Sequence, residues 1–211
     1  GTKSRFDKSG TPTMGGLLII GAILFATAIA GNFTNKFVVF LFVITILFTT
    51  IGFYDDYLKL TKHKNGLSGK KKILGQMIIT ALTFWFVYKF GLVNKTIDFS
   101  IINPLIKNSY LYITPILFFV FIAFVIIGSS NAVNLTDGLD GLVSGPIIVV
   151  SITLLIITYL TGHHNYARYL NLYHIPEVSE ITVYLASIIG ALIGFLWYNF
   201  YPAQMFMGDT G

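Results

Sequence analysis

Residues 37–56, FVVFLFVITILFTTIGFYDD, decide the fold, because a long run of mostly apolar side chains ends in two adjacent acids, Asp55 and Asp56. A helix needs roughly 20 such residues to cross the hydrocarbon layer of a bilayer. A strand of a membrane barrel would instead alternate apolar and polar side chains over about ten residues. The stretch therefore predicts a transmembrane helix over residues 37–53 with a carboxylate pair at its end.

Five other stretches have the same character, and they cover about residues 14–31, 73–90, 111–128, 142–160 and 181–201. The 211-residue chain is 55% hydrophobic and only 11% charged, with a mean hydropathy of +0.75, far from the composition of a soluble domain. We expect an all-α fold, a polytopic transmembrane helix bundle with six spans, forming one integral membrane domain over residues 1–211. Pro115 is expected to kink the fourth span.

The basic residues predict the orientation of these spans. With an even number of spans, both ends of the chain lie on one side of the membrane, together with the connections at residues 54–72 and 129–141. That side carries nine of the 14 Lys and Arg residues: Lys3, Arg5, Lys8, Lys59, Lys62, Lys64, Lys70, Lys71 and Lys72. The positive-inside rule makes it the cytoplasmic side. The net charge of +5 then serves topology and contact with anionic lipid, so we expect membrane lipid and no nucleic acid as a partner.

Most of the aspartates fall on the same side as these basic residues. Asp55, Asp56, Asp137, Asp140 and Asp209 each lie at or just beyond the end of an apolar run. Their placement predicts one shared acidic site at the cytoplasmic membrane surface. The chain has no cysteine, which excludes disulfides, thiolate metal sites and cysteine nucleophiles.

The segment Lys8-Ser-Gly-Thr-Pro-Thr-Met-Gly-Gly16 stands directly before the first span. Its glycines let the backbone approach an anion, and its hydroxyls, its N–H groups and the following helix N-terminus suit phosphate binding. A plain helix start, with Pro12 in the first turn and polar caps, explains the same residues. Both interpretations remain open from this segment alone.

The pair Asp55-Asp56 is followed by Lys59 at a spacing of one helical turn. Adjacent helical residues point about 100° apart, so one acid is expected to meet a metal or an attacking group while the other pairs with Lys59 or caps a neighbouring segment. Two like charges this close are also expected to raise one of the two pKa values, which suits a proton acceptor. A cluster of charges at the bilayer boundary is the alternative.

Four polar residues recur every third position in Asn131-Ala-Val-Asn134-Leu-Thr-Asp137-Gly-Leu-Asp140. This spacing keeps them near one face in a 3₁₀ turn or folded loop. Carboxylates can share a hydrated magnesium ion with substrate phosphates, and asparagines can recognise amide or ring edges. The array therefore predicts part of a binding site rather than a plain polar turn.

The last acid, Asp209, lies between glycines in Gly208-Asp-Thr-Gly211, close after Asn199 and Phe206. The sequence resembles a metal-binding turn, but an aspartate that bonds its own backbone would explain it equally well.

These four segments, in this order, resemble the motifs of the phospho-N-acetylmuramoyl-pentapeptide transferase (translocase I) family, within the polyprenyl-phosphate N-acetylhexosamine-1-phosphate transferase superfamily. The resemblance covers essentially the whole chain. It implies a multi-pass protein of the bacterial inner membrane with ten helices, of which this chain holds the second to the seventh. The chain is therefore expected to be a fragment that lacks the first helix, the last three helices and a His-rich motif. The resemblance also suggests a homodimer.

The resemblance implies transfer of phospho-MurNAc-pentapeptide from UDP-MurNAc-pentapeptide to undecaprenyl phosphate, giving lipid I and UMP with Mg²⁺ as cofactor. This is the first membrane step of peptidoglycan synthesis. Such chemistry brings several negative charges together, so it needs a metal, cations and alignment more than covalent chemistry.

The resemblance also implies roles for individual residues. Asp209 is the expected metal ligand, and Asp55 the expected base or orienting group for the lipid phosphate, with Asp56 beside it in the catalytic group. A two-step alternative makes Asp209 a nucleophile. The expected substrate-binding residues are Lys8, Thr13 and Lys59 for phosphates or charge balance, Asn134, Asp137 and Asp140 on the nucleotide side with Asn131 in support, and Asn199 and Phe206 at the uridine.

Three other functions compete with this one. A GlcNAc-1-phosphate transferase of the same superfamily would use similar acids, but the Thr-Pro-Thr-Met-Gly-Gly loop favours the muramoyl branch. A CDP-alcohol phosphotransferase needs spaced acids that this chain lacks. An ion-coupled transporter would place its acids near the middle of the bilayer, whereas these lie at helix ends.

Overall fold

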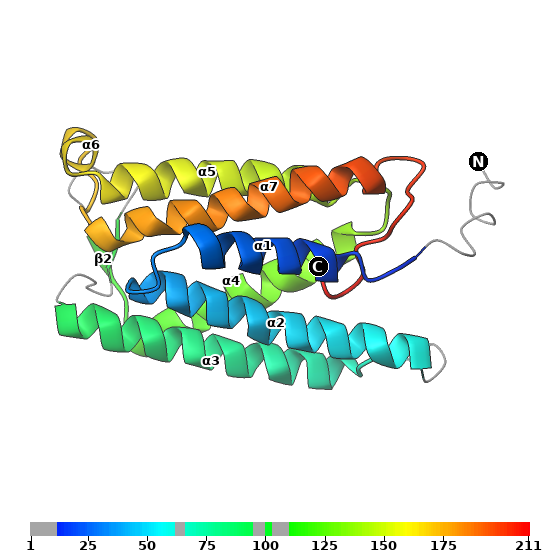
Figure 1. The fold of residues 1–211 in the computed structure, drawn as a ribbon. Coiled ribbons are helices and arrows are strands. Elements are labelled where there is room, and N and C mark those ends of the chain that lie inside the picture. The colour runs from blue at the N-terminus through cyan, green and yellow to red at the C-terminus, as the bar shows by residue number, and fades with distance from the viewer. Residues whose placement is uncertain (1–11, 62–65, 95–99, 103–109) are drawn as a thin grey trace. The chain divides into compact units, whose positions relative to one another are not determined.

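The computed structural model describes residues 12–61, 66–94, 100–102 and 110–211, and it describes no side chains between residues 90 and 112 (Figure 1). Six helices of 15 residues or more dominate it: α1 (Gly16–Ala30), α2 (Lys36–Thr61), α3 (Gly69–Asn94), α4 (Pro115–Thr136), α5 (Ser144–Gly162) and α7 (Ile181–Asn199). Each overlaps one of the six predicted apolar stretches, although α4 begins four residues later than predicted and continues to Thr136. The predicted helical bundle is therefore confirmed.

Smaller elements occupy the connections. They are the hairpin of β1 (Ser100–Ile102) and β2 (Tyr110–Tyr112), with Ser100 opposite Tyr112, the short helix α6 (His164–Tyr169) and the 3₁₀ turn η2 (Pro176–Glu180). Pro115 is the first residue of α4, where its missing N–H costs no helical hydrogen bond. The prediction that it would kink the fourth span is therefore wrong.

The described helices include four that are long and apolar enough to cross a membrane: α2, α4, α5 and the continuous segment of η2 and α7. The helix α1 is apolar but has only 15 residues. The length and apolar character of these helices make this a multi-pass membrane protein, while the count of six spans stays a prediction.

The chain divides into two compact units, residues 1–67 with 134–211, and residues 68–133. The prediction of a single membrane domain is left untested by this division. In the first unit α7 packs against both α5 and α1, and α2 packs against α1. Its buried apolar side chains include Ile19, Ile23, Val38, Leu192 and Phe195.

Polar contacts between the helices of the first unit supplement this small core. The Thr27 and Ser187 hydroxyls lie 3.1 Å apart between α1 and α7, and the Thr45 and Tyr184 hydroxyls lie 2.5 Å apart between α2 and α7. Many large apolar side chains face outward instead, among them Trp197, which is 83% exposed. Lipid tails can cover such side chains, so little of the apolar surface has to be buried inside the bundle.

The second unit contains α3 and most of α4. Gln76 of α3 is buried, and its side chain donates to the Ser130 hydroxyl at 3.1 Å and accepts from the Asn131 amide at 3.0 Å. Phe84 packs edge-to-face on Phe119 with ring centroids 5.3 Å apart. These contacts join α3 to α4 without any charged side chain.

Candidate active site

The predicted carboxylate pair lies in the last turns of α2, which continues to Thr61 rather than ending near residue 53. The helix therefore holds both side chains in fixed directions. Asp55 is 4% exposed and Asp56 is 7% exposed. Because neighbouring helical residues point about 100° apart, the two carboxylates meet different partners.

Asp55 meets a cation and a backbone amide. Its Oδ2 lies 3.2 Å from the Nζ of Lys59, one helical turn further on, and its Oδ1 accepts a hydrogen bond of 2.5 Å from the Leu67 N–H. A Cβ at Gly66 would collide with the same carboxylate. Gly66 and Leu67 therefore lie directly against the Asp55 carboxylate, and the absence of a side chain at Gly66 makes this close approach possible.

Lys59 connects Asp55 to the far end of the chain. Its Nζ also lies 2.6 Å from Oδ2 of Asp209, so one ammonium group bridges two carboxylates. The other oxygen of Asp209, Oδ1, accepts a hydrogen bond of 3.0 Å from the Asn134 amide at the end of α4. Residues from three of the four predicted motifs thus meet at the Asp209 carboxylate.

Asp56 contacts the backbone of the turn that carries Asp209. Its Oδ1 accepts from the Asp209 N–H at 3.1 Å, and its Oδ2 accepts from the Thr210 N–H at 2.9 Å and the Thr210 hydroxyl at 2.6 Å. Asp55 therefore pairs with Lys59, and Asp56 caps a neighbouring segment. The predicted contact of one of the two acids with a metal or an attacking group stays a prediction.

Asp137 approaches the same turn from the loop after α4. Burial of its side chain raises the pKa of Asp137, the charges of Asp209 and Asp56 raise it further, and a hydrogen bond from the Gly208 N–H lowers it in part. Consecutive N–H groups at Gly208, Asp209 and Thr210 therefore all face carboxylates. Such a row of amides forms an anion-binding concavity, here filled by the protein's own acids.

Two further predicted residues organise the loop after α7. Asn199 is 1% exposed, its Oδ1 accepts from the Gly141 N–H at 3.0 Å, and its amide donates to the Met205 carbonyl at 2.8 Å. Asp140 accepts from the Ala203 N–H through its Oδ2 at 3.3 Å. These bonds tie the loop that carries Asp137 and Asp140 to the loop that carries Phe206. Contact of Asn199 and Phe206 with uridine stays a prediction.

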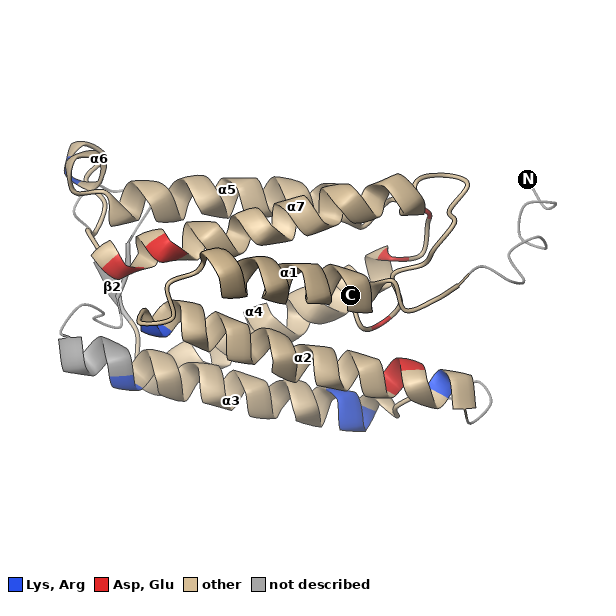
Figure 2. Ribbon diagram, viewed as in Figure 1, with Lys and Arg blue, Asp and Glu red and all other residues tan. Residues whose placement is uncertain are grey.

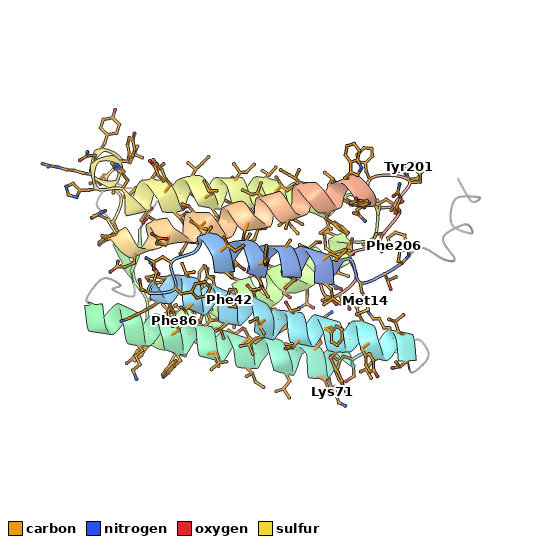
Figure 3. The ribbon with its side chains drawn as sticks, in the orientation of Figure 1. Met14, Phe42, Lys71, Phe86, Tyr201 and Phe206 are labelled. Atoms are coloured by element: carbon orange, nitrogen blue, oxygen red, sulfur yellow. The ribbon has the colours of Figure 1, made fainter. Side chains whose placement is uncertain are left out.

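The loop before α1 lies alongside residues 206 and 207. The Gly15 and Gly16 N–H groups donate to the carbonyls of Phe206 and Met207, both at 2.8 Å, and the Phe206 N–H donates to the Pro12 carbonyl at 3.0 Å. Figure 3 labels Met14 and Phe206 at this junction. Backbone carbonyls therefore accept from these two glycine amides. Phosphate binding by the loop as a whole stays a prediction.

The structure thus gathers Asp55, Asp56, Lys59, Asn134, Asp137, Asp140, Asn199, Phe206 and Asp209 in the first unit. Figure 2 shows the acids in red at the end of α2 and in the loops after α4 and α7. Thr13 is exposed in the loop before α1, Asn131 belongs to the second unit, and Lys8 lies outside the described residues. Their predicted roles stay predictions.

The sequence did not point to several residues that shape the site. Gly52, Leu67 and Thr210 all contact the acidic residues or their turn. Gly52 and Thr210 lie inside two of the motifs, but the pattern of acids predicted no role for either residue. Leu67 acts through its backbone N–H, which no side-chain pattern reveals.

The donor atoms at this site suit a hard cation. The carboxylates of Asp55 and Asp209 already contact one positive group, the Lys59 ammonium, at 3.2 and 2.6 Å. Among the described residues no three acidic or histidine side chains form a ready metal site. A magnesium ion on Asp209 would therefore complete its shell with water and phosphate oxygens, which is its usual mode of binding.

Taken together, the fold and the site define a multi-pass membrane protein with a carboxylate-rich site at one end of its helices. Comparison with known proteins narrows this class. Residues 37–211 match the model of glycosyl transferase family 4, and residues 8–20 match signature 1 of phospho-N-acetylmuramoyl-pentapeptide transferases. The chain belongs to glycosyl transferase family 4.

A curated relative from Fusobacterium nucleatum, named phospho-N-acetylmuramoyl-pentapeptide-transferase, is 47% identical over 212 aligned residues. The alignment covers 100% of this chain and 58% of that relative. The chain thus spans somewhat more than half the length of the curated relative. The signature at residues 8–20 includes Lys8 and Thr13.

Proposed function

We propose that the complete protein transfers phospho-MurNAc-pentapeptide from UDP-MurNAc-pentapeptide to undecaprenyl phosphate, releasing UMP and forming lipid I. The observation that carries the proposal is the meeting of Asp55, Lys59 and Asp209 at one end of membrane helices. A lipid phosphate lies at the membrane surface, so an acceptor of this kind suits a site at a helix end. The 47% identity to the named transferase supports the same reaction.

The reaction requires one bond to form and one to break. An oxygen of the lipid phosphate attacks the phosphorus bonded to the sugar, the P–O bond to the UMP phosphate breaks, and UMP leaves with that oxygen. We assign Asp55 to orient the attacking phosphate and to accept its proton. Asp55 suits this role because it lies in a helix, is nearly buried, and is held by Lys59 and Leu67.

Asp209 is proposed as the magnesium ligand. Bound magnesium would supply positive charge for the pyrophosphate oxygens. The Lys59 ammonium and the Asn134 amide each contact one oxygen of the Asp209 carboxylate and so fix its direction. Lys59 would keep the site neutral enough for two phosphorylated substrates to approach.

The remaining predicted residues would hold the nucleotide sugar. Asn134, Asp137 and Asp140 surround the Asp209 turn and its neighbouring loop, with Asn131 further back on α4, and Phe206 and Asn199 belong to the segment expected to meet uridine. Lys8 and Thr13 are assigned to phosphate. The proposed setting is the cytoplasmic face of the bacterial inner membrane, with a homodimer as the proposed assembly.

Release of UMP tests this function directly. The complete protein in detergent would receive UDP-MurNAc-pentapeptide and undecaprenyl phosphate, with Mg²⁺ in one sample and EDTA in the other. Magnesium-dependent UMP that requires both substrates is the expected result. Turnover of UDP-GlcNAc alone would move the chain to the sister branch of the superfamily, and ion flux in liposomes without any UMP would favour a transporter.

A further inference from the structure

The turn that carries Asp209 is held from several sides, and Asp56, expected above in the catalytic group, is one of the residues that hold it. Asp56 accepts two backbone N–H groups of the turn and the Thr210 hydroxyl. Thr210 is 4% exposed, so its hydroxyl is shielded from water and depends on this bond. The carboxylate of Asp56 thus faces the backbone of the turn, while Asp209 presents its own carboxylate to Lys59 and Asn134.

The contact between Asp56 and the turn requires the backbone of the turn to lie very close to α2. A Cβ at Gly52, one helical turn before Asp56 on α2, would collide with the carbonyl of Asp209. Gly208 has φ of +76°, which favours glycine, and a Cβ there would lie 2.9 Å from the Asp56 Oδ2. On the opposite side of the turn, a Cβ at Gly16 would collide with the Gly211 backbone. The turn is therefore seated directly against two helices.

We propose that Thr210 and Gly52 are positioning residues that fix Asp209, with Asp56 as the carboxylate through which Thr210 acts. In this arrangement Asp56 holds the backbone of the turn through hydrogen bonds, and Asp55 orients the attacking phosphate. The Thr210 hydroxyl orients one Asp56 oxygen, and the missing side chain at Gly52 lets the Asp209 carbonyl reach its place. The inference rests on the proposed function for its kinetic consequences, and on the contacts alone for its structural ones.

The contacts imply a specific pattern among variants of the complete protein. Thr210→Val keeps the shape of the side chain and removes the donor, whereas Thr210→Ser keeps the donor. Gly52→Ala adds the colliding methyl group, and Gly21→Ala is its matched control, because a Cβ at Gly21 meets nothing within 4 Å. We expect kcat to fall roughly 10- to 100-fold in Thr210→Val and Gly52→Ala, because an error of about 1 Å in placing a reacting group has a cost of this order.

The KM values for both substrates should change less than about 2-fold in these variants, because uniform binding is not removed. Thr210→Ser and Gly21→Ala should retain turnover close to that of the unsubstituted protein. Equal loss in Thr210→Ser and Thr210→Val would overturn the role of the hydroxyl. Full turnover in Thr210→Val, or equal loss in Gly21→Ala and Gly52→Ala, would overturn the proposal as well.

Amide hydrogen exchange tests the same contacts without relying on activity. In the complete protein, a peptide spanning residues 205–211 should exchange about 10-fold faster in Thr210→Val than in Thr210→Ser, because a hydrogen bond to a charged group is lost. Unchanged exchange in Thr210→Val would contradict the positioning role. If the unsubstituted protein released no UMP, the proposed function would fail, and the exchange measurement would still decide whether Thr210 holds the turn.

Discussion

The two ends of the first unit are built differently, although both consist of polar connections between membrane helices. At one end, Lys59 and Asn134 both contact Asp209, which lies more than 70 positions away from each of them in the sequence. At the other end, where Figure 1 shows α6, two described side chains lie against backbone carbonyls. There the Asn35 amide donates to the Glu177 carbonyl at 2.7 Å, and the His174 ring lies 3.2 Å from the Gly162 carbonyl.

This difference indicates which end has a function beyond connecting helices. Gathering carboxylates costs free energy, because like charges repel and burial disfavours the ionised form. A neutral side chain that donates to a backbone carbonyl connects two segments without that cost, as Asn35 does at the α6 end. At the acidic end, Lys59 and the amides of Leu67, Asp209 and Thr210 offset the cost. The protein therefore maintains an arrangement that a simple loop does not need.

Neutralising the acids should give the largest effect. We expect Asp209→Asn or Asp55→Asn in the complete protein to lower UMP release by roughly 1,000-fold or more, because preorganised charge at the reacting centre is lost. Asn has nearly the same size, so the amount of folded protein by size-exclusion chromatography should change little. Glu177→Gln, at the opposite end, is the matched control and should leave turnover unchanged. Near-normal rates in Asp209→Asn and Asp55→Asn would remove the functional distinction between the two ends.

Removing the bridging cation should give the next largest effect. Lys59→Met keeps much of the side-chain length but leaves two carboxylates without their common partner, and we expect turnover to fall roughly 100-fold. Lys59→Arg keeps the charge and should recover a large part of the rate. Steady-state UMP release with varied Mg²⁺ measures both variants. If Lys59→Met retained normal turnover at every Mg²⁺ concentration, the bridge would be a surface contact of little consequence.

The sequence predicted the acidic end better than it predicted how that end is held. Helix positions followed from continuous apolar runs, and the meeting of Asp55 and Asp209 followed from the even number of spans. Backbone partners such as the Leu67 N–H have no side-chain signature, so their roles emerged only in three dimensions. The glycines before α1 were compatible with phosphate binding, yet their N–H groups donate to the carbonyls of residues 206 and 207. The sequence of the loop alone does not show that the segment at 206–207 lies beside it.

The pKa of Asp137 predicts a smaller effect, on stability and its pH dependence. Because folding raises this pKa, the protonated carboxyl favours the folded state; that stability is fully present below the unfolded pKa and is lost as pH rises through the folded pKa. Asp137→Asn removes the charge, so its melting temperature relative to the unsubstituted protein should increase between pH 4 and pH 8. The gain should be roughly 1–2 °C, given that the side chain is partly exposed.

Thermal unfolding without substrates measures this gain, and Glu180→Gln at the opposite end is the control. A melting temperature for Asp137→Asn that falls relative to the unsubstituted protein with rising pH would mean that the Gly208 hydrogen bond outweighs repulsion by Asp56 and Asp209. Asp137 would then be a carboxylate whose ionised form stabilises the acidic end, rather than one whose burial costs free energy.

The smallest effect is expected in the first turn of α7, where the Tyr184 hydroxyl meets the Thr45 hydroxyl of α2. Tyr184→Phe removes this bond and leaves the ring, and hydrogen bonds between membrane helices contribute only about 0.6 kcal/mol on average. We therefore expect a melting temperature lower by roughly 2 °C and unchanged UMP release. Thr45→Val should produce the same shift, and the double variant should be no less stable than either single one, because each removes the same bond. A marked loss of turnover in Tyr184→Phe would mean that the acidic end depends on the packing of the helices along their length, and not only on the contacts among its own residues.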